Sequence, residues 1–480
     1  MNKSYAINKI KEQEQLFTSI ADSIWEYAEL SLQEYQSADL LASTLENLGF
    51  EVEREVAGIK TAFLGKFGAG RPVIGILGEF DALTGLSQAA DVAEHTPIAG
   101  KQNGHGCGHH LLGAGALAAA YGIKEYLRES GREGTVIFYG TPGEEGGAAK
   151  AFMAKEGIFY DLDCALTWHP ADVSEVVTGT CNSCIQTLYK FHGVASHAAG
   201  SPELGRSALD AVELMNIGVQ FLREHTGDDA RIHYAIVNGG GLSPNVVQPE
   251  ASVLYMTRAT LMADTVALQA RVDKIAEGAA MMTDTTLERI FVDGCSNTVP
   301  NHTIEKLLYE NYLEHGVPTY TDEELAYAEQ LRATFPEGAV SECIASRFDP
   351  VARARFDELS EGGAKVLNDF LSPLYMGECF MAGSTDVGDV SWQTPTVQLH
   401  ALTYPAGAPG HSWQNVAYGK SSVAHKGMMC AGEVLCMCAI DLYEKPHILM
   451  AAREEFAIRA KSGYVCPIPD GEHAKIVEIN

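Results

Sequence analysis

The spacing of apolar residues changes several times along the chain and predicts an alternation of helices and strands. Apolar residues at near-helical intervals, such as Ile10 and Ile24, predict a helix over residues 8–30. A second helix is expected over residues 37–48, and Gly49 ends its pattern. Strand-like runs follow at 50–56, 61–66 and 73–77. The first part of the chain therefore reads as a mixture of helices and strands.

Acidic residues follow the apolar strand predicted at 73–77. Glu79 and Asp81 stand where that strand ends. Ligand sites of α/β sheets form outside the carboxyl ends of the strands, so both carboxylates are candidates for a site. A turn carrying two solvated acids fits the same residues, and both interpretations stay open.

A second acidic pair lies in a glycine-rich turn. Residues 135–139 read as a buried strand, and glycines flank Glu144 and Glu145 just after it. Glycine lets the chain bend tightly, so both carboxylates can reach one point. A further strand at 163–168 is followed directly by His169. The repeated order of strand, polar residues and helix predicts a mostly parallel sheet with its ligand groups at the carboxyl edge.

The pattern changes at about residue 186 and again near residue 300. Between these points lie the predicted strands 186–193, 233–237, 252–258 and 285–292 and the predicted helices 208–224 and 265–282. Two helices over a small antiparallel sheet form a compact α+β domain of ordinary size. We therefore expect a catalytic domain in two parts, 1–185 and 299–480, interrupted by a domain at 186–298. An acidic, helical insertion is expected within the second part, at about 317–370.

The loop 103–110 concentrates the chemistry of the chain, because it carries one thiol and three imidazoles. A helix predicted at 111–128 follows it. The partial positive charge of a helix N-terminus would lower the pKa of the Cys107 thiol and favour the thiolate. Cys107 and His109 can face one point, and thiolate and imidazole are the ligands that a borderline transition metal prefers. Taken alone, the loop also fits a buried cysteine beside an ordinary histidine.

Other donors strengthen the metal interpretation. His411 precedes a helix and follows a glycine, so we prefer it to His400, and His105 and His110 read as loop or core residues. The full donor set is Cys107, His109, His169, His411 and one of Glu144 and Glu145. Five nitrogen, oxygen and sulfur donors suit a pair of Mn²⁺ or Zn²⁺ ions better than Mg²⁺. Such a pair activates water and polarises a carbonyl, while the second glutamate transfers the proton, which predicts metal-assisted amide hydrolysis.

Composition narrows the class of protein. Hydrophobic residues make up 46% and charged residues 20% of the 480 residues, which is an ordinary globular balance. The net charge of −29 disfavours nucleic acid and anionic membranes, because both attract clustered Lys and Arg. No apolar run approaches the roughly 20 residues that span a bilayer, and residues 1–20 do not resemble a signal peptide. With eleven irregularly spaced cysteines, we expect reduced thiols and a cytoplasmic protein.

These motifs together resemble the aminoacylase/carboxypeptidase clan of co-catalytic metallopeptidases, and in particular its amidohydrolase branch, which uses Cys-x-His. The resemblance rests on the segments Cys107-Gly-His109, Pro142-Gly-Glu-Glu-Gly-Gly147, Trp168-His-Pro170 and the late His411. Further similar stretches begin at Leu77, Leu166, Leu204, Ser243, Ser384 and Ala424. The resemblance therefore covers nearly the whole chain.

The resemblance implies an α/β fold: a zinc-peptidase-like catalytic domain with a mixed, mostly parallel sheet, interrupted by an α+β, ferredoxin-like lid domain that dimerises. It also implies two divalent metal ions per chain, Mn²⁺ or Zn²⁺. The implied metal ligands are Cys107, His109, Glu145, His169 and His411.

Other roles are implied residue by residue. Glu144 would be the general base, and His197 of the inserted domain would hydrogen-bond the oxyanion in the active site of the partner subunit. Asn245 would help to bind substrate. Arg258 is a candidate for a substrate carboxylate, while a structural ion pair is an equally good interpretation.

The chain departs from the clan in two places. Many members carry His-x-Asp where this sequence has Glu79-Phe80-Asp81. We therefore expect the Cys107 loop to supply the first ligand, and Asp81 to orient a ligand from behind. The second departure is Ser384-Thr385-Asp386, where the branch usually has Ser-Glu-Asp.

The function implied by the resemblance is hydrolysis of the amide bond of an N-acyl amino acid, with p-aminobenzoyl-glutamate as the expected substrate. A dipeptidase or a hydrolase of aryl- or indole-acyl amino acids would use the same chemistry. A third alternative is a non-catalytic subunit of a heteromeric hydrolase. The expected partner is a second copy of the chain or a paralogous subunit, with no nucleic acid and no membrane.

Overall fold

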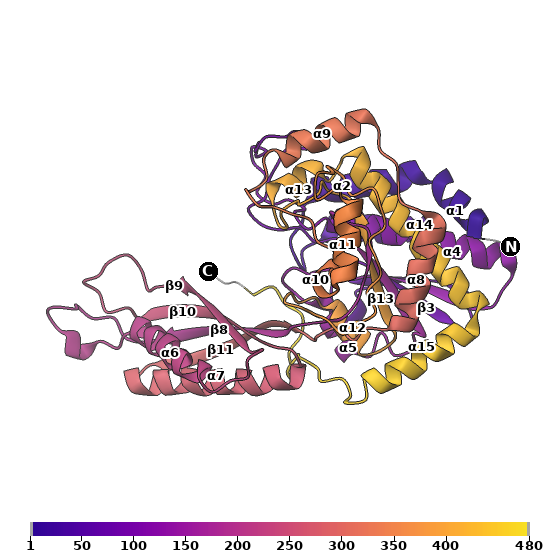
Figure 1. The fold of residues 1–480 in the computed structure, drawn as a ribbon. Helices are drawn as coiled ribbons and strands as arrows, with labels where there is room; N and C mark the ends of the chain where they lie inside the picture. Colours follow the sequence, from indigo (N-terminus) through magenta and orange to yellow (C-terminus); the bar gives the residue numbers. More distant parts are fainter. Residues whose placement is uncertain (1–2, 478–480) are drawn as a thin grey trace. The chain divides into compact units, whose positions relative to one another are not determined.

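The computed structural model describes residues 3–477, and the chain divides into two units (Figure 1). The first unit comprises residues up to Gly179, then Val299–Phe380 and Val390–Tyr464. The second comprises Thr180–Thr298, Met381–Asp389 and the segment from Val465. Its main part thus begins at Thr180, where the sequence pattern suggested 186, and it recruits two later segments that carry no boundary signal in the sequence.

The first unit is built on a seven-stranded sheet of order β1-β2-β4-β3-β5-β13-β6. Its strands are β1 (Glu51–Arg54), β2 (Phe63–Ala69), β3 (Val73–Gly78), β4 (Gly134–Gly140), β5 (Cys164–Ala171), β6 (Glu175–Val177) and β13 (Thr396–Leu402). The four central strands, β4, β3, β5 and β13, run parallel to one another, and the outer pairings are antiparallel. Because Gly78 pairs with Gly140, the carboxyl ends of β3 and β4 lie level with each other. This confirms the mixed, mostly parallel sheet expected from the sequence.

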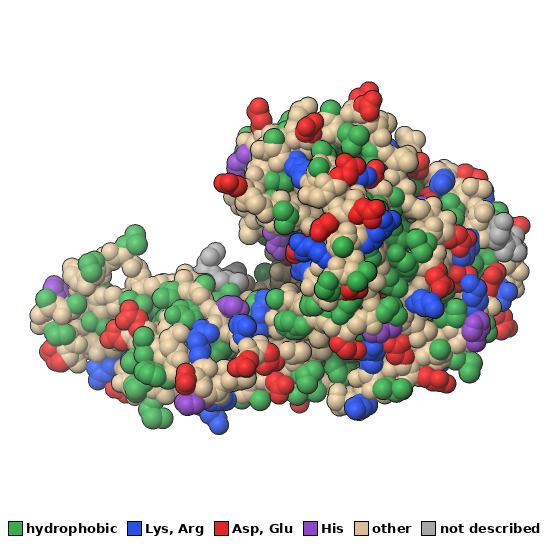
Figure 2. All heavy atoms as spheres, in the orientation of Figure 1, with side chains coloured by type: hydrophobic (Ala, Val, Ile, Leu, Met, Phe, Trp, Pro, Cys, Tyr) green, Lys and Arg blue, Asp and Glu red, His purple; other side chains and the backbone are tan. Residues whose placement is uncertain are grey.

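The helices of this unit cover the sheet and complete the core. They are α1 (Lys3–Glu12), α2 (Glu14–Tyr27), α3 (Tyr35–Asn47), α4 (His109–Ser130), α5 (Ala149–Lys155), α8 (His302–His315), α9 (Asp322–Arg332), α10 (Ile344–Phe348), α11 (Pro350–Leu359), α13 (Trp413–Tyr418), α14 (Ser422–Glu444) and α15 (Pro446–Arg459), with a 3₁₀ turn, η1, at Val56–Gly58. The single helix predicted over 8–30 is wrong, because the chain breaks at Gln13 and forms α1 and α2 instead. The expected acidic insertion contains α9, α10 and α11, and acidic side chains stand out on the surface around α9 in Figure 2.

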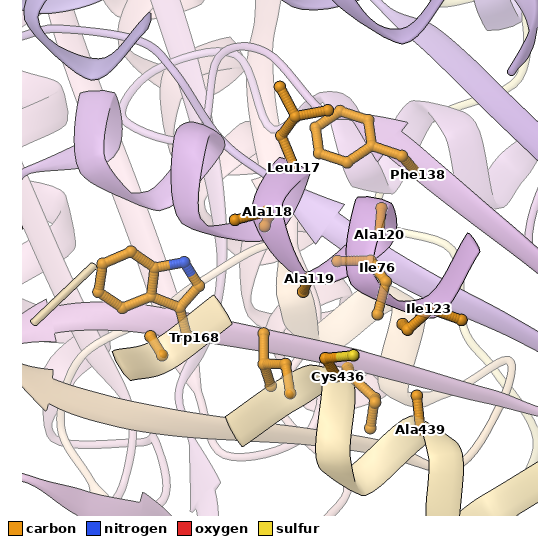
Figure 3. Close-up of a cluster of buried hydrophobic side chains, with 14 of the residues drawn as sticks. Ile76, Leu117, Ala118, Ala119, Ala120, Ile123, Phe138, Trp168, Cys436 and Ala439 are labelled. Atoms are coloured by element: carbon orange, nitrogen blue, oxygen red, sulfur yellow. The ribbon is translucent and has the colours of Figure 1, made fainter. Parts of the chain in front are cut away.

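The helices α4 and α14 pack closely at the centre of the first unit (Figure 3). A Cβ added to Gly432 would lie 2.7 Å from the carbonyl oxygen of Gly115, so small residues let the two backbones approach. Ala119 and Ile123 of α4 face Cys436 and Ala439 of α14 in this core. α14 is long and apolar enough to cross a membrane by composition alone, but 89% of its most apolar window is buried in the protein, as in a core helix.

The second unit is a four-stranded antiparallel sheet of order β11-β8-β10-β9, with two helices packed on its apolar face. Its elements are β7 (Thr180–Cys181), β8 (Ser183–His192), a 3₁₀ turn, η2, at Pro202–Leu204, α6 (Ala208–Arg223), β9 (Arg231–Asn238), β10 (Glu250–Ala259), α7 (Met262–Thr283) and β11 (Thr286–Cys295). Two short elements, β12 (Phe380–Met381) and α12 (Val387–Ser391), lie where the chain passes between the units. The predicted pattern of two helices over a small antiparallel sheet is confirmed.

Candidate metal centre

The loop before α4 brings a thiol and an imidazole to the edge of the sheet. α4 begins at His109, directly after Gly108, whose φ of 90° lies in the left-handed region that favours glycine. Cys107 precedes this turn, and its Sγ lies 3.3 Å from Nε2 of His169 on β5. The loop therefore joins the N-terminus of a helix to the end of a parallel strand.

Asp81 fixes the tautomer of His109. Nδ1 of His109 lies 2.8 Å from Oδ1 of Asp81, so the ring proton is on Nδ1 and is donated to the carboxylate. The other ring nitrogen, Nε2, is buried and has no hydrogen-bond partner among the described residues. A histidine held from behind by a carboxylate, with its second nitrogen free, is the usual arrangement of a metal ligand.

His169 is held in the same way by the backbone. Its Nδ1 lies 2.8 Å from the carbonyl oxygen of Pro170, which leaves the Nε2 lone pair directed toward Cys107. Burial, helped by the nearby His109 and His400, lowers the pKa of His169 to about 3. The ring is therefore neutral at physiological pH, as a metal ligand must be.

The turn after β4 presents the two glutamates, and two buried carboxylates hold it in place. The backbone N–H of Glu145 donates to Oδ2 of Asp81 at 2.9 Å, and the N–H of Gly143 donates to Oε1 of Glu34 at 2.8 Å. Oε1 of Glu145 is buried without a hydrogen-bond partner among the described residues and lies 3.4 Å from Nε2 of His411. Burial raises the pKa of Glu145. No sequence pattern indicated the part that Glu34 plays, because that acid lies far away along the chain.

The structure collects all five predicted ligands and the predicted base. Within the described chain, three sets of donor atoms lie within 4.8 Å of one another: Cys107, His109 and His169; Cys107, Glu145 and His411; and Glu79, His109 and Glu144. Asp81 belongs to none of these sets and stands behind His109 and Glu145, as the sequence suggested.

His411 differs from the other donors because its side chain is 55% exposed. It has a φ of 50°, and Ser412 after it caps the N-terminus of α13. His400 lies apart from this geometry, because its Nδ1 pairs with Oε1 of Glu175 at 3.0 Å. The preference for His411 over His400 thus agrees with the contacts that the two side chains make.

Glu79 and Lys150 form a buried ion pair next to the donor cluster. The sequence did not predict this pairing. Nζ of Lys150 lies 2.8 Å from Oε1 of Glu79, and both side chains are almost fully buried. The other carboxylate oxygen lies 3.3 Å from Nε2 of His109. Burial opposes ionisation of Glu79, but the positive charge of Lys150 holds the pKa of that carboxyl below its usual value. Glu79 therefore brings a negative charge directly to the donor cluster.

The expectation that the helix N-terminus lowers the thiol pKa of Cys107 is wrong for the protein groups alone. Burial raises the pKa of Cys107 to about 12, and the negative charges of Glu145 and Glu144 act in the same direction. Desolvation of the thiol outweighs the effect of the helix dipole here. A bound cation would reverse this balance, since a coordinating thiol is deprotonated outright.

The second unit carries the other predicted residues in its loops and on β10. Nδ1 of His197 accepts hydrogen bonds from the N–H groups of Ala199 and Gly200, so its ring proton is on Nε2. The carbonyl of Asn245 accepts a hydrogen bond from the N–H of Ala198, which ties the loops of Asn245 and His197 together. Both predicted residues are exposed.

Arg258 has a partner within its own unit. Its Nη1 donates to Oγ of Ser384 at 2.8 Å, which brings β10 to the segment Ser384-Thr385-Asp386. The arginine is partly buried. This contact is not the structural ion pair that the sequence left open, and the guanidinium retains further N–H groups for a carboxylate.

The donor set fits divalent metal ions on its own chemistry. Nδ1 of His109 and Nδ1 of His169 are both held by hydrogen bonds. Oε1 of Glu145 and Nε2 of His109 are buried without a hydrogen bond among the described residues. The thiol of Cys107 belongs to donor sets with each of these residues. Unsatisfied buried polar atoms are rare in folded proteins, and a bound ion is one of the accepted reasons for them.

Comparison with known proteins agrees with this chemistry. Residues 75–344 match the Peptidase family M20/M25/M40. The chain is 45% identical over 467 residues to a subunit of p-aminobenzoyl-glutamate hydrolase from Escherichia coli (strain K12), covering 96% of each protein. It is 25% identical to the Xaa-Arg dipeptidase of Mus musculus, over 95% of this chain and 92% of that protein.

Solved structures show the same fold at low sequence identity. An aminobenzoyl-glutamate utilization protein from Klebsiella pneumoniae aligns with a TM-score of 0.58 at 15% identity, over 91% of this chain and 98% of that one. A dinuclear metal-binding peptidase of the M20 family from Bacillus subtilis aligns with a TM-score of 0.55 at 16% identity, over 90% and 99%. The chain therefore belongs to Peptidase family M20/M25/M40, and it is a metal-dependent hydrolase that acts on amide bonds.

Proposed function

We propose that the chain hydrolyses p-aminobenzoyl-glutamate to p-aminobenzoate and glutamate. The observation that carries the proposal is the convergence of Cys107, His109, Glu145, His169 and His411 on one edge of the sheet, with the donor atoms His109 Nε2 and Glu145 Oε1 unsatisfied. The 45% identity to a protein named for this substrate, over 96% of both chains, supports the choice of substrate.

The same five residues are the proposed ligands of two divalent ions, Mn²⁺ or Zn²⁺. Two of the three donor sets share Cys107, which supports two adjacent ions rather than one. When bound, such ions supply Lewis-acid activation of water and polarise the amide carbonyl. The mixture of sulfur, nitrogen and oxygen donors favours Mn²⁺ or Zn²⁺ over Mg²⁺.

Glu144 is the proposed general base. One of its carboxylate oxygens lies within 4.8 Å of the His109 and Glu79 donor atoms, so the group stands beside these two donors. There it takes a proton from the attacking water and delivers it to the amide nitrogen as the C–N bond breaks. Glu145, the neighbour in the turn, is left to bind metal.

His197 and Asn245 are proposed to serve the active site of a second subunit. Because Nδ1 of His197 already accepts two backbone hydrogen bonds, its Nε2–H is the group available to donate to an oxyanion. Asn245 is tied to the same loop and is proposed to bind substrate. Arg258 remains the proposed partner of the glutamate carboxylate, using the N–H groups that Ser384 does not occupy.

The second unit has a surface suited to such a partner. β9 is the last strand of its sheet, and Tyr234 and Ile236 on it are exposed. On α6, Leu214, Ile217 and Phe221 are 38%, 57% and 73% exposed and recur at helical spacing. Hydrophobic side chains also reach the surface over α6 and α7 in Figure 2. An open strand edge beside an apolar stripe favours pairing with another subunit, either a second copy or a paralogue.

The first experiment is hydrolysis of p-aminobenzoyl-glutamate by the purified chain alone. The protein is stripped of metal, then reloaded with Mn²⁺ or Zn²⁺, and release of glutamate is measured. We expect activity only after reloading, and a Glu144→Ala protein that binds metal without turnover. Full turnover by Glu144→Ala would refute the assignment of the base.

The same assay separates the alternatives. Cleavage of Xaa-Arg dipeptides or of indole-acyl amino acids in preference to p-aminobenzoyl-glutamate would identify a related hydrolase instead. No hydrolysis of any of these substrates by a chain with two metal ions bound would indicate a protein that needs a paralogous partner.

The eleven cysteines, all free, suit the proposed cytoplasmic location.

A mixing experiment tests the role of His197. Proteins carrying His197→Ala and Glu144→Ala are each expected to be inactive, because each lacks one half of every site. Mixed dimers should regain about half of the wild-type rate per dimer, since one of their two sites is intact, and a random mixture of the two proteins should regain about a quarter. Verified mixed dimers without any rescue would show that each site is built from a single chain.

A further inference from the structure

The hydroxyl of Tyr404 is buried close to the metal-binding loop without a hydrogen-bond partner. Tyr404 follows β13 and is 3% exposed, and its Oη is unsatisfied among the described residues. A buried hydroxyl without a partner costs about 1–3 kcal/mol. Such a hydroxyl is a candidate donor to a group that changes or enters when the site binds its ligand.

The position of the hydroxyl is fixed from both sides. The backbone N–H of Tyr404 bonds to the carbonyl of Ala171 at the end of β5. The ring packs in an apolar cluster with residues including Ala417 and Tyr418. Only a small movement of the hydroxyl is therefore open to the side chain.

The hydroxyl points at the Cys107–His109 loop. Oη lies 2.3 Å from the position that a Cβ on Gly108 would occupy, and Pro170 lies 2.9 Å from the same position. Gly108 is thus required both by its φ of 90° and by the closeness of Tyr404. The hydroxyl stands between the segment that carries Cys107 and the residue after His169.

The chemistry of the neighbours limits what the hydroxyl can bind. The thiol of Cys107 lies near the hydroxyl of Tyr404, and a phenol is neutral at physiological pH and donates through its O–H. Pro170 has no N–H, and the backbone of the loop forms no bond to Oη. The acceptor that would arise here is the sulfur of Cys107 in its thiolate form.

We propose that Tyr404 is a positioning residue whose phenolic O–H donates a hydrogen bond to the Cys107 thiolate when metal is bound. The inference rests on the proposed metal site, because the thiolate is its acceptor. The hydrogen bond withdraws charge from sulfur and fixes the direction of its lone pairs toward the metal ions. Tyr404 would therefore tune both the affinity for metal and the electron density on sulfur.

The test uses Co²⁺ as the probe, since a thiolate bound to Co²⁺ gives a near-ultraviolet charge-transfer band. The full-length protein is stripped of metal and titrated with Co²⁺ in four forms: wild type, Tyr404→Phe, Tyr418→Phe and Cys107→Ser. Tyr418 is the matched control, because its buried hydroxyl also lacks a partner and lies in the same apolar cluster. The ring of Tyr418 stacks on Tyr327. The charged groups that act on its hydroxyl are Glu324 and Asp91, which are not part of the metal-binding loop.

We expect the band in the wild type and its loss in Cys107→Ser. Tyr404→Phe should shift the band to lower energy and weaken Co²⁺ binding about tenfold, as removal of a supporting hydrogen bond does. Tyr418→Phe should match the wild type. Circular dichroism and the thermal midpoint verify that each variant is folded.

Each other outcome is decisive. No band in the wild type would refute Cys107 as a ligand, and with it the proposed metal site. A band in the wild type that is unchanged in Tyr404→Phe, at unchanged affinity, would overturn the role of Tyr404 alone. Equal changes in Tyr404→Phe and Tyr418→Phe would show a general packing effect and would also overturn it.

Discussion

Replacing Asp81 by Asn tests whether this carboxylate organises the metal centre. Asp81 is buried, and it accepts three hydrogen bonds: from His109 Nδ1 at 2.8 Å, from Ser31 Oγ at 2.8 Å and from the Glu145 N–H at 2.9 Å. Burial would raise its pKa, but the hydrogen bond from His109 outweighs this and lowers the pKa to about 2. The group is therefore an anion that only accepts.

An asparagine cannot reproduce this arrangement. Its oxygen can serve one side of the site, but its NH₂ group must then face a donor on the other side. If the NH₂ group faces His109, the imidazole must move its proton to Nε2 and loses the lone pair that would bind metal. If it faces Ser31 and Glu145, the turn that carries Glu145 is released.

The magnitude follows from these contacts. A hydrogen bond to a charged group contributes about 1.5–3 kcal/mol, and 1.4 kcal/mol corresponds to a factor of ten. Loss of a residue that orients a metal ligand typically weakens binding 10–100-fold. We therefore expect Asp81→Asn to bind Zn²⁺ or Mn²⁺ about 10–100 times more weakly than the wild type.

The assay is competition between the protein and a chelator of known affinity, with circular dichroism as a check on folding. Ser31→Ala serves as the control, because it removes one hydrogen bond and leaves the carboxylate; we expect a change of less than about threefold. If folded Asp81→Asn bound metal as tightly as the wild type, while Cys107→Ser did not, the supporting role of Asp81 would be refuted.

Two further predictions concern stability. Lys150→Met leaves the buried Glu79 charge unpaired and should lower the free energy of unfolding by about 3–5 kcal/mol. In urea denaturation, the double variant Lys150→Met/Glu79→Gln should lose less free energy of unfolding than the two single variants lose together. His315 is half of a second buried pair: burial lowers its pKa, but hydrogen bonds to Cys430 and Glu433 outweigh this and raise the pKa to about 10. Because this folded pKa is above the unfolded value of about 6.5, its stabilisation is complete below about pH 6.5 and is lost as pH rises toward 10. The difference in thermal midpoint between wild type and His315→Gln should therefore shrink from pH 6.5 to pH 10, and a constant difference would contradict the charged state of His315.

The donors at strand ends could be predicted from the sequence because position along a strand determines position at the sheet edge. Glu145 follows β4, and His169 lies near the end of β5, while Cys107 precedes α4. In a parallel sheet, these points come together whatever the details of side-chain packing. The family resemblance supplied the choice of ligand within the Glu144 and Glu145 pair, which spacing alone left open.

The supporting residues could not be predicted, because their roles depend on contacts between distant parts of the chain. Lys150 lies in a short helix and looks like an ordinary surface lysine, yet it is fully buried against Glu79. Glu34 precedes α3 and reaches across to the N–H of Gly143. The prediction for the thiol pKa of Cys107 was wrong for the same reason, since burial is a property of the whole fold and the helix dipole is local.

The distribution of burial gives the metal centre a closed side and an open side. The ring of His109 and the carboxylates of Glu79 and Asp81 are buried, and their outer atoms are held by Lys150 and by one another. His411, by contrast, is 55% exposed at a backbone position with positive φ. A catalytic metal site needs fixed ligands on one side and room for water and substrate on the other. We therefore propose that the substrate amide approaches from the side of His411.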